Sequence, residues 1–79
     1  MDRTEYLKMC QKVSVYKKIS GVITDLPDEL KVRYKEIVYY PLEYILSFDK
    51  EQPRHTAVLH DLNSNSIVHA ELEKVENYG

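Results

Sequence analysis

The sequence lacks most of the devices that reinforce a small protein. Its 79 residues include one cysteine, Cys10, only two glycines and no tryptophan. A single cysteine excludes an internal disulfide and favours a reducing compartment. So few glycines exclude the glycine-rich loops that cradle phosphate groups in nucleotide-binding enzymes. A chain this short buries a modest core, so we expect a partner subunit to contribute to its stability.

Long apolar runs and a positive net charge are also missing. No run is long enough to cross a bilayer, and none has the character of a signal peptide. The formal net charge of −2 argues against general nucleic-acid binding, which depends on neutralising phosphates. We therefore expect one cytoplasmic domain, residues 1–79, that binds neither membranes nor nucleic acid in general.

Charge is distributed unevenly along the chain. Residues 1–35 carry eight basic and five acidic side chains, a balance of +3, whereas residues 36–79 carry three basic and eight acidic ones, a balance of −5. Opposite poles of this kind steer contacts between subunits or attract a charged partner. Solvated faces of different sign are the more common explanation.

Hydrophobic periodicity predicts one helix at the amino terminus. Four apolar residues at helical spacing predict a helix over residues 3–14: Tyr6, Leu7, Cys10 and Val13. Within residues 15–29 the sequence indicates only a short strand at Val22-Ile23 and a turn at residues 26–29.

From Leu30 the period changes to two, which predicts β-strands. The predicted strands cover residues 30–35, 37–40, 44–48, 54–62 and 67–75. Lys35-Glu36 and the segment 49–53 are the predicted turns, and Pro41 marks an edge, a bulge or a break. One helix followed by a small antiparallel sheet of about five strands is an α+β arrangement. An SH3-like or Sm-like barrel is the best match.

The last two predicted strands form a hairpin with a polar tip. If the turn is centred between Ser64 and Asn65, Leu59 lies opposite Ala70 and His60 lies opposite His69. One face of this hairpin is then apolar, and the other is mixed. A mixed face is either an ordinary solvated surface or one covered by a ligand or another subunit.

The polar tip and the preceding aromatic residues supply a candidate ligand site. A histidine and asparagine amides beside backbone donors suit a small anionic or nucleotide-like ligand, and tyrosines can stack on its base. The predicted ligand-binding residues are His60, Asp61, Asn63, Asn65, Ser66, Tyr39, Tyr40 and Arg33. Each also has a structural explanation, because asparagines stabilise turns, tyrosines pack at core edges and alternating cations keep strands soluble.

Catalytic and metal sites are not indicated by the sequence. Cys10 falls on the apolar side of the predicted helix, where cysteine usually acts as a small hydrophobe. The spacing of His60, Asp61 and His69 matches no zinc signature. We therefore expect a protein that is not an enzyme, needs no cofactor and binds no metal.

Several segments spread over the chain form a recognisable set. They are Glu5 to Cys10, Tyr39-Tyr40-Pro41, Tyr44, Leu46, Phe48-Asp49, His55 to Leu62 and Asn65-Ser66. Through these segments, much of the chain resembles small uncharacterised proteins encoded by phages and prophages of Gram-positive bacteria. The resemblance implies a viral accessory protein that counters host antiviral defence in the host cell cytoplasm.

Three mechanisms are consistent with such a role. In the first, which we favour, a homo-oligomer sequesters a nucleotide signalling molecule in clefts between its subunits, as a sponge does. In the second, the protein binds and blocks a host defence protein by mimicking nucleic acid, as anti-CRISPR proteins do. In the third, the protein is a structural or regulatory phage component without a ligand.

Overall fold

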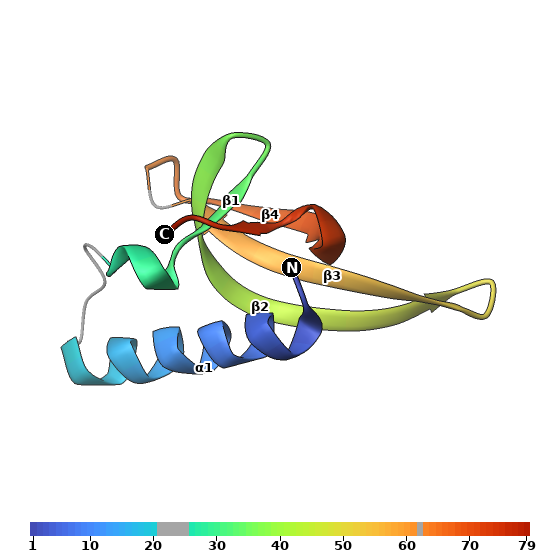
Figure 1. The fold of residues 1–79 in the computed structure, drawn as a ribbon, viewed down its shortest axis with the longest axis horizontal. Coiled ribbons are helices and arrows are strands. Elements are labelled where there is room, and N and C mark those ends of the chain that lie inside the picture. The colour runs from blue at the N-terminus through green and yellow to red at the C-terminus, as the bar shows by residue number, and fades with distance from the viewer. Residues whose placement is uncertain (21–25, 62) are drawn as a thin grey trace.

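The computed structural model describes residues 1–20, 26–61 and 63–79. One helix, α1 (Arg3–Ser20), lies against an antiparallel sheet of five strands (Figure 1). The strands are β1 (Val32–Tyr34), β2 (Ile37–Asp49), β3 (Gln52–Asp61), β4 (Ser66–Glu71) and β5 (Glu76–Asn77). Two short 3-10 helices, η1 (Asp28–Leu30) and η2 (Leu72–Lys74), connect them. The predicted α+β class is confirmed, whereas the predicted strand at Val22-Ile23 lies outside the described residues.

The sheet is open. Its strand order is β4-β3-β2-β1-β5, so β4 and β5 are its two edges and do not pair with each other in the part of the chain that the structure describes. The expected SH3-like or Sm-like barrel is therefore not confirmed. Figure 1 shows β2 bending strongly, so that its first half lies beside β1 and its second half runs out with β3 in a long hairpin.

A β-bulge explains the bend in β2. The predicted strands 37–40 and 44–48 are one strand, and its register against β3 shifts between Pro41 and Glu43. An extra residue in one strand bends it and increases its twist. The hydroxyl of Tyr6 in α1 donates to the carbonyl oxygen of Val58 at 2.9 Å and lies 3.1 Å from that of Glu43. The helix is thus anchored where the bulge disturbs the sheet.

Helix α1 is longer than predicted and buries a different set of residues. Tyr6, Met9 and Val13 are buried, whereas Leu7 is 37% exposed. The prediction of Leu7 as a core residue is wrong, because the side of the helix that faces the sheet passes through Met9 instead. No helix among the described residues is long and apolar enough to cross a membrane.

The core has two parts. The larger cluster joins α1 to strands β1 to β4 and to the segment that follows β4. It contains Tyr6, Met9, Val32, Tyr39, Ala57, Leu59, Ala70, Leu72 and Val75. The smaller cluster of Val13, Leu26 and Leu30 lies where α1 meets η1, and Tyr16 and Tyr40 pack against it. The strand predicted for residues 30–35 is found only as β1 at Val32–Tyr34, because Leu30 belongs to η1, although Leu30 and Val32 are both buried.

Both early hairpins turn in two residues. Lys35 and Glu36 have φ of 49° and 65°, and Lys50 and Glu51 have φ of 51° and 67°. Left-handed conformations at both central residues are those of a type I′ turn, which matches the twist of the flanking strands. The predicted turn at Lys35-Glu36 is confirmed. The second turn is shorter than the predicted 49–53 loop, because β2 continues to Asp49 and β3 begins at Gln52.

The β3–β4 hairpin has a different register from the one predicted. Leu59 lies opposite Val68, His60 opposite Ile67 and Val58 opposite His69, so the predicted pair of His60 with His69 is wrong. The pairing is displaced by two residues, and such a displacement leaves every side chain on its predicted face. The strand predicted for residues 67–75 ends at Glu71, and the chain continues through η2 into β5.

Candidate functional site

The predicted site residues gather at the end of the sheet where β3 turns into β4. A cavity of about 160 Å³ opens there, which we call the His60 pocket. Its lining residues are Lys31, Val38, Tyr39, Tyr40, His60, Asp61 and Asn63. Five of the eight predicted residues therefore lie together. Asn65, Ser66 and Arg33 are not among those lining it.

Two adjacent strands place the aromatic and imidazole groups. Tyr40 of β2 lies directly opposite His60 of β3, and His60 lies opposite Ile67 of β4. Tyr40 is half-buried against the smaller core cluster, and Tyr39 is buried in the larger one. Both tyrosines thus have the core-edge role that the sequence offered as an alternative. Only Tyr40 keeps part of its ring exposed for a ligand.

Asp61 organises the turn rather than projecting from it. One of its carboxylate oxygens accepts the backbone N–H of Asn63 at 2.9 Å, and the other accepts the hydroxyl of Ser64 at 3.0 Å. The hydroxyls of Ser64 and Ser66 are 2.9 Å apart. Asn65 has a φ of 56°, a left-handed conformation that asparagine tolerates. Asp61 was predicted to bind a ligand, and in the structure its carboxylate closes the turn.

The His60 ring is held by the same turn. Its Nε2 lies 3.1 Å from the side-chain oxygen of Asn65. An amide oxygen only accepts hydrogen bonds, so Nε2 carries a proton and donates. In the neutral ring this leaves Nδ1 as an acceptor, and in the charged ring Nδ1 is a second donor. Asn65 therefore fixes both the orientation and the tautomer of His60.

The cation at the pocket is Lys31 rather than Arg33. The Lys31 side chain is 17% exposed, and its Nζ lies 3.1 Å from the Asp28 carboxylate. The Arg33 guanidinium lies over the Tyr78 ring, 5.6 Å from its centroid. Lys31 and Arg33 both belong to the series of cations that alternates with apolar residues from Leu30 to Lys35. The sequence therefore predicted cations on this strand, but it did not indicate which of them would lie near the tip of the β3–β4 hairpin.

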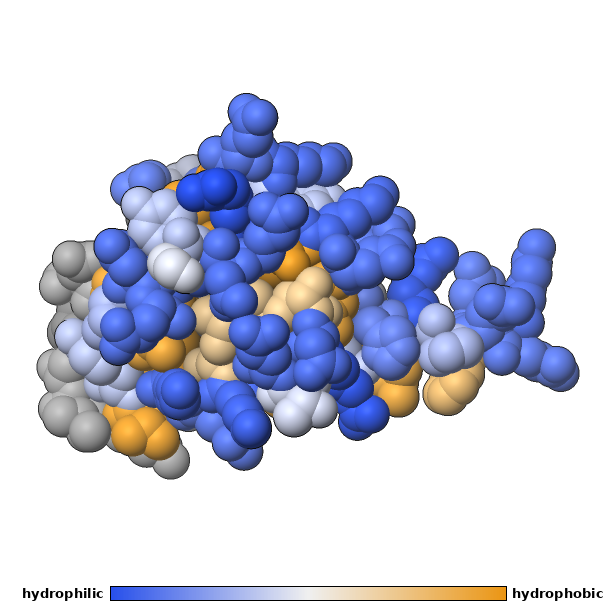
Figure 2. All heavy atoms as spheres, viewed as in Figure 1, coloured by the Kyte–Doolittle hydropathy of each residue, from blue (hydrophilic) through white to orange (hydrophobic). Residues whose placement is uncertain are grey.

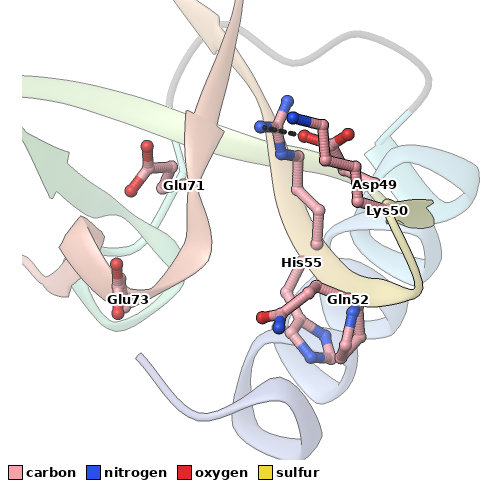
Figure 3. Close-up of a pocket in the computed structure, with 8 residues that line it drawn as sticks. Asp49, Lys50, Gln52, His55, Glu71 and Glu73 are labelled. Atoms are coloured by element: carbon pink, nitrogen blue, oxygen red, sulfur yellow. Dashed lines mark hydrogen bonds and ion pairs between the residues drawn. The ribbon is translucent and has the colours of Figure 1, made fainter.

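A second, larger cavity was not predicted. It has a volume of about 600 Å³ and is lined by Asp49, Lys50, Gln52, Pro53, Arg54, His55, Glu71 and Glu73. Figure 3 shows Glu71 and Glu73 on one side, facing the residues of the β2–β3 hairpin on the other. An ion pair joins Arg54 to Asp49 at 3.3 Å, and the Tyr44 hydroxyl is hydrogen-bonded to His55 Nδ1. This cavity is mixed in charge and singles out no ligand.

Cys10 does not have the properties of a nucleophile. It is half-buried and packs against the larger core cluster. Burial raises the pKa of its thiol above the ordinary value, and the hydrogen bond with Tyr6 offsets this only in part. A protonated thiol is a weak nucleophile. Among the residues that the structure describes, no three of the His, Cys, Asp and Glu side chains are grouped so as to hold a metal ion.

Comparisons with protein-family models, with curated proteins and with solved structures find no match to this chain. A function has to be argued from the chain's own residues.

Proposed function

We propose that the protein is a non-enzymatic binding protein that takes a nucleotide-like ligand at the His60 pocket and sequesters it. The observation that supports this proposal is the convergence of an imidazole, an amide, an ammonium group and a half-exposed phenol ring on one small cavity. Ligand sites typically combine apolar walls with a few convergent polar groups.

The groups divide between the two parts of a nucleotide. A base stacks on the exposed part of the Tyr40 ring, because every base has a π-face and aromatic side chains accept it. Phosphate oxygens accept hydrogen bonds from the Asn63 amide and the Lys31 ammonium. His60 donates to a phosphate when its ring is charged. Asn65 holds that ring in place, so little conformational entropy is lost when the ligand binds.

The volume of the pocket indicates that one chain does not enclose the whole ligand. Sites for complete small molecules usually have volumes of roughly 300–1,000 Å³, whereas the His60 pocket has about 160 Å³. It accommodates one ring or one phosphate group. We therefore propose that the rest of the ligand is covered by a second subunit, so that the ligand lies in a cleft of a homo-oligomer.

Sequestration agrees with the resemblance to phage proteins. An accessory protein that removes a nucleotide immune signal from the host cytoplasm needs tight binding and no catalytic groups.

Binding can be tested with a panel of cyclic and ADP-ribose-type nucleotides by thermal shift and isothermal titration calorimetry. We expect at least one member to raise the melting temperature. His60→Ala and Asn63→Ala should each weaken its binding by about tenfold or more, which corresponds to about 1.4 kcal/mol. Arg33→Ala is the matched control, because Arg33 does not line the pocket, and it should leave the affinity unchanged. Absence of a shift with every nucleotide, or full binding by His60→Ala, would contradict the proposal.

A second candidate function is docking on a host defence protein, as a mimic of nucleic acid. It is favoured by the exposed carboxylates Glu71, Glu73 and Glu76 in the acidic half of the chain. In that case Glu71→Lys with Glu73→Lys should weaken capture of a host protein, and wild-type capture should decline with rising salt. A wild-type complex that is insensitive to both changes would exclude this function.

A further inference from the structure

The far part of the β2–β3 hairpin extends beyond the rest of the sheet. We call residues 44–56 the arm; Figure 1 shows it reaching away from α1. Strand β1 pairs only with Ile37–Tyr39 of β2, and β4 ends at Glu71, opposite Thr56. Within the described residues, the arm beyond Thr56 is therefore a ribbon of two strands. Such a ribbon is marginally stable in water when nothing covers it.

One face of the arm is apolar and exposed. Leu46 is 41% exposed and Phe48 is 71% exposed. They lie on the same face of β2 as Tyr44, which packs against the larger core cluster. Leu46 and Phe48 therefore continue the face that α1 covers nearer the core. Figure 2 shows hydrophobic atoms along the arm on the side where α1 lies. This face is apolar like the core, but its side chains are exposed to solvent.

The β2 edge of the arm is also open to main-chain pairing. Asp49 and Gln52 flank a two-residue turn and so form a hydrogen-bonded pair. Pairs alternate along a ladder, and the N–H and C=O groups of Phe48 and Leu46 consequently point away from β3. On the β3 edge, Pro53 removes one donor by the same alternation.

The β2 edge has no comparable protection. The segment from Tyr44 to Phe48 contains neither proline nor a charged residue, which are the usual means of blocking an edge strand. Exposed edges with uncharged side chains of high β-propensity pair readily with other strands. Open main-chain groups and an open apolar face thus coincide on one five-residue segment.

We propose that this edge pairs with the same edge of a second copy of the chain, antiparallel about a two-fold axis at Ser47. In this register Leu46 lies opposite Phe48 of the second copy, and the reverse pair forms across the axis. Both residues have outward main-chain groups, so the required hydrogen bonds can form. The sheets of the two copies become one continuous sheet.

The segment is complementary to itself, and this identifies the occupant. The two-fold arrangement brings Leu46 and Phe48 of both copies together on one face, continuous with Tyr44 and the two cores. At each end, Ile45 of one copy lies opposite Asp49 of the other, and Tyr44 lies opposite Lys50. An isologous contact of this kind closes on itself and leaves no β2 edge for further addition.

This contact is independent of the ligand proposed above. Figure 1 shows the β3–β4 turn, which carries the His60 pocket, at the opposite end of the molecule from the tip of the arm. Arm pairing therefore leaves both pockets uncovered, and the subunit proposed above to cover the ligand makes a separate contact. His60→Ala tests the ligand without touching the arm, and the variants below test the arm without touching the pocket.

Sedimentation and light scattering at about 100 µM protein test the contact, since small interfaces of this kind are often weak. Without added nucleotide, we expect the wild type to be a dimer and Phe48→Lys to be a monomer, and the melting temperature of the diluted proteins should be the same. The control is Ile67→Lys, because Ile67 is 59% exposed but lies on the edge strand β4. This variant should remain a dimer. A monomeric wild type, or dissociation by Ile67→Lys and not by Phe48→Lys, would overturn the proposal.

A cysteine at the axis tests the register. Ser47→Cys, in a Cys10→Ser background, should form an intermolecular disulfide under mild oxidation, because facing residues at the axis lie within disulfide range. Ile45→Cys is the matched control. Ile45 lies opposite Asp49 of the second copy, so the two Ile45 positions are four residues apart along the strand, about 13 Å. Cysteines at this position should not cross-link. Cross-linking at Ile45 and not at Ser47 would overturn the proposed register, and cross-linking at neither would overturn the paired edge.

Discussion

At the scale of single residues, the Tyr6 hydroxyl joins helix to sheet. It donates to the Val58 carbonyl and lies within hydrogen-bond distance of the Glu43 carbonyl, at the bulge in β2. Burial is the main cause that raises the pKa of Tyr6 above its ordinary value. The sequence placed Tyr6 on the buried side of the helix from its spacing. Its hydroxyl contact depends on the bulge between Pro41 and Glu43, which the helical spacing of residues 6–13 does not report.

Tyr6→Phe should destabilise the fold at neutral pH. The substitution keeps the ring but leaves buried carbonyl oxygens without their donor, which costs about 1–3 kcal/mol. Urea unfolding measures this loss. Tyr78→Phe is the control, because Tyr78 is 37% exposed, and its effect should be within about 0.5 kcal/mol.

The same substitution has a signature in pH. Because the pKa of Tyr6 is raised in the folded state, its contribution is complete below the unfolded pKa of about 10 and is lost as the pH rises above that value. The wild type should therefore lose stability above about pH 10, by up to about 1.4 kcal/mol per pH unit from this group. Tyr6→Phe lacks this loss, and the difference between the two proteins should narrow. A constant difference from pH 8 to pH 11 would show that the hydroxyl is not held in its neutral form.

At the scale of elements, alternation predicted the strands and turn chemistry did not predict their pairing. Alternation predicted strands within residues 30–48, and it coincides with burial at Val32 and Tyr39. The last hairpin was displaced by two residues because Asp61 closes the turn through the Asn63 N–H, a contact that no periodicity encodes. The predicted site residues still lie together, because a displacement of two residues leaves each side chain on the same face of the hairpin. The predicted pairing of His60 with His69, in contrast, is wrong.

The turn at Lys35-Glu36 is strained by its sequence. Both residues adopt left-handed conformations, with φ of 49° and 65°. Such conformations cost L-residues with a Cβ roughly 1–2 kcal/mol each, and asparagine and glycine tolerate them. The strands on either side select this turn in spite of its residues.

Replacing Lys35-Glu36 by Asn-Gly should stabilise the protein. The relief of backbone strain exceeds the extra unfolded-state entropy of glycine, which is about 0.5–1 kcal/mol. We expect a net gain of about 1 kcal/mol, or a rise of about 4–8 °C in melting temperature for a domain of this size. Lys35→Ala with Glu36→Ala removes the same two charges without relieving φ and should give no gain. An equal rise in both variants would mean that charge, and not backbone strain, limits this turn.

At the scale of the whole molecule, the two ends of the chain complete the fold. Strand β5 pairs with β1, with Asn77 opposite Val32 and Glu76 opposite Arg33. The Asn77 side chain donates to the Glu5 carboxylate at 2.9 Å, which links β5 to the first turn of α1. The Tyr78 N–H donates to the Lys31 carbonyl at 3.2 Å. The sequence did not predict β5, because strands of two residues carry too little periodicity to be recognised.

Removing residues 76–79 should destabilise the whole fold rather than shorten a tail. The truncation leaves Val75 in the core but removes β5, its main-chain bonds to β1 and the link from Asn77 to Glu5. Each lost hydrogen bond costs about 0.5–1.5 kcal/mol, which gives roughly 2–4 kcal/mol in total. Domains have only about 5–15 kcal/mol of stability, so urea unfolding should show a clearly lower midpoint and a single transition. Glu76→Ala keeps the strand and should unfold like the wild type. An unchanged midpoint for the truncated chain would mean that β1 needs no partner on its outer side, and that the sheet is complete with four strands.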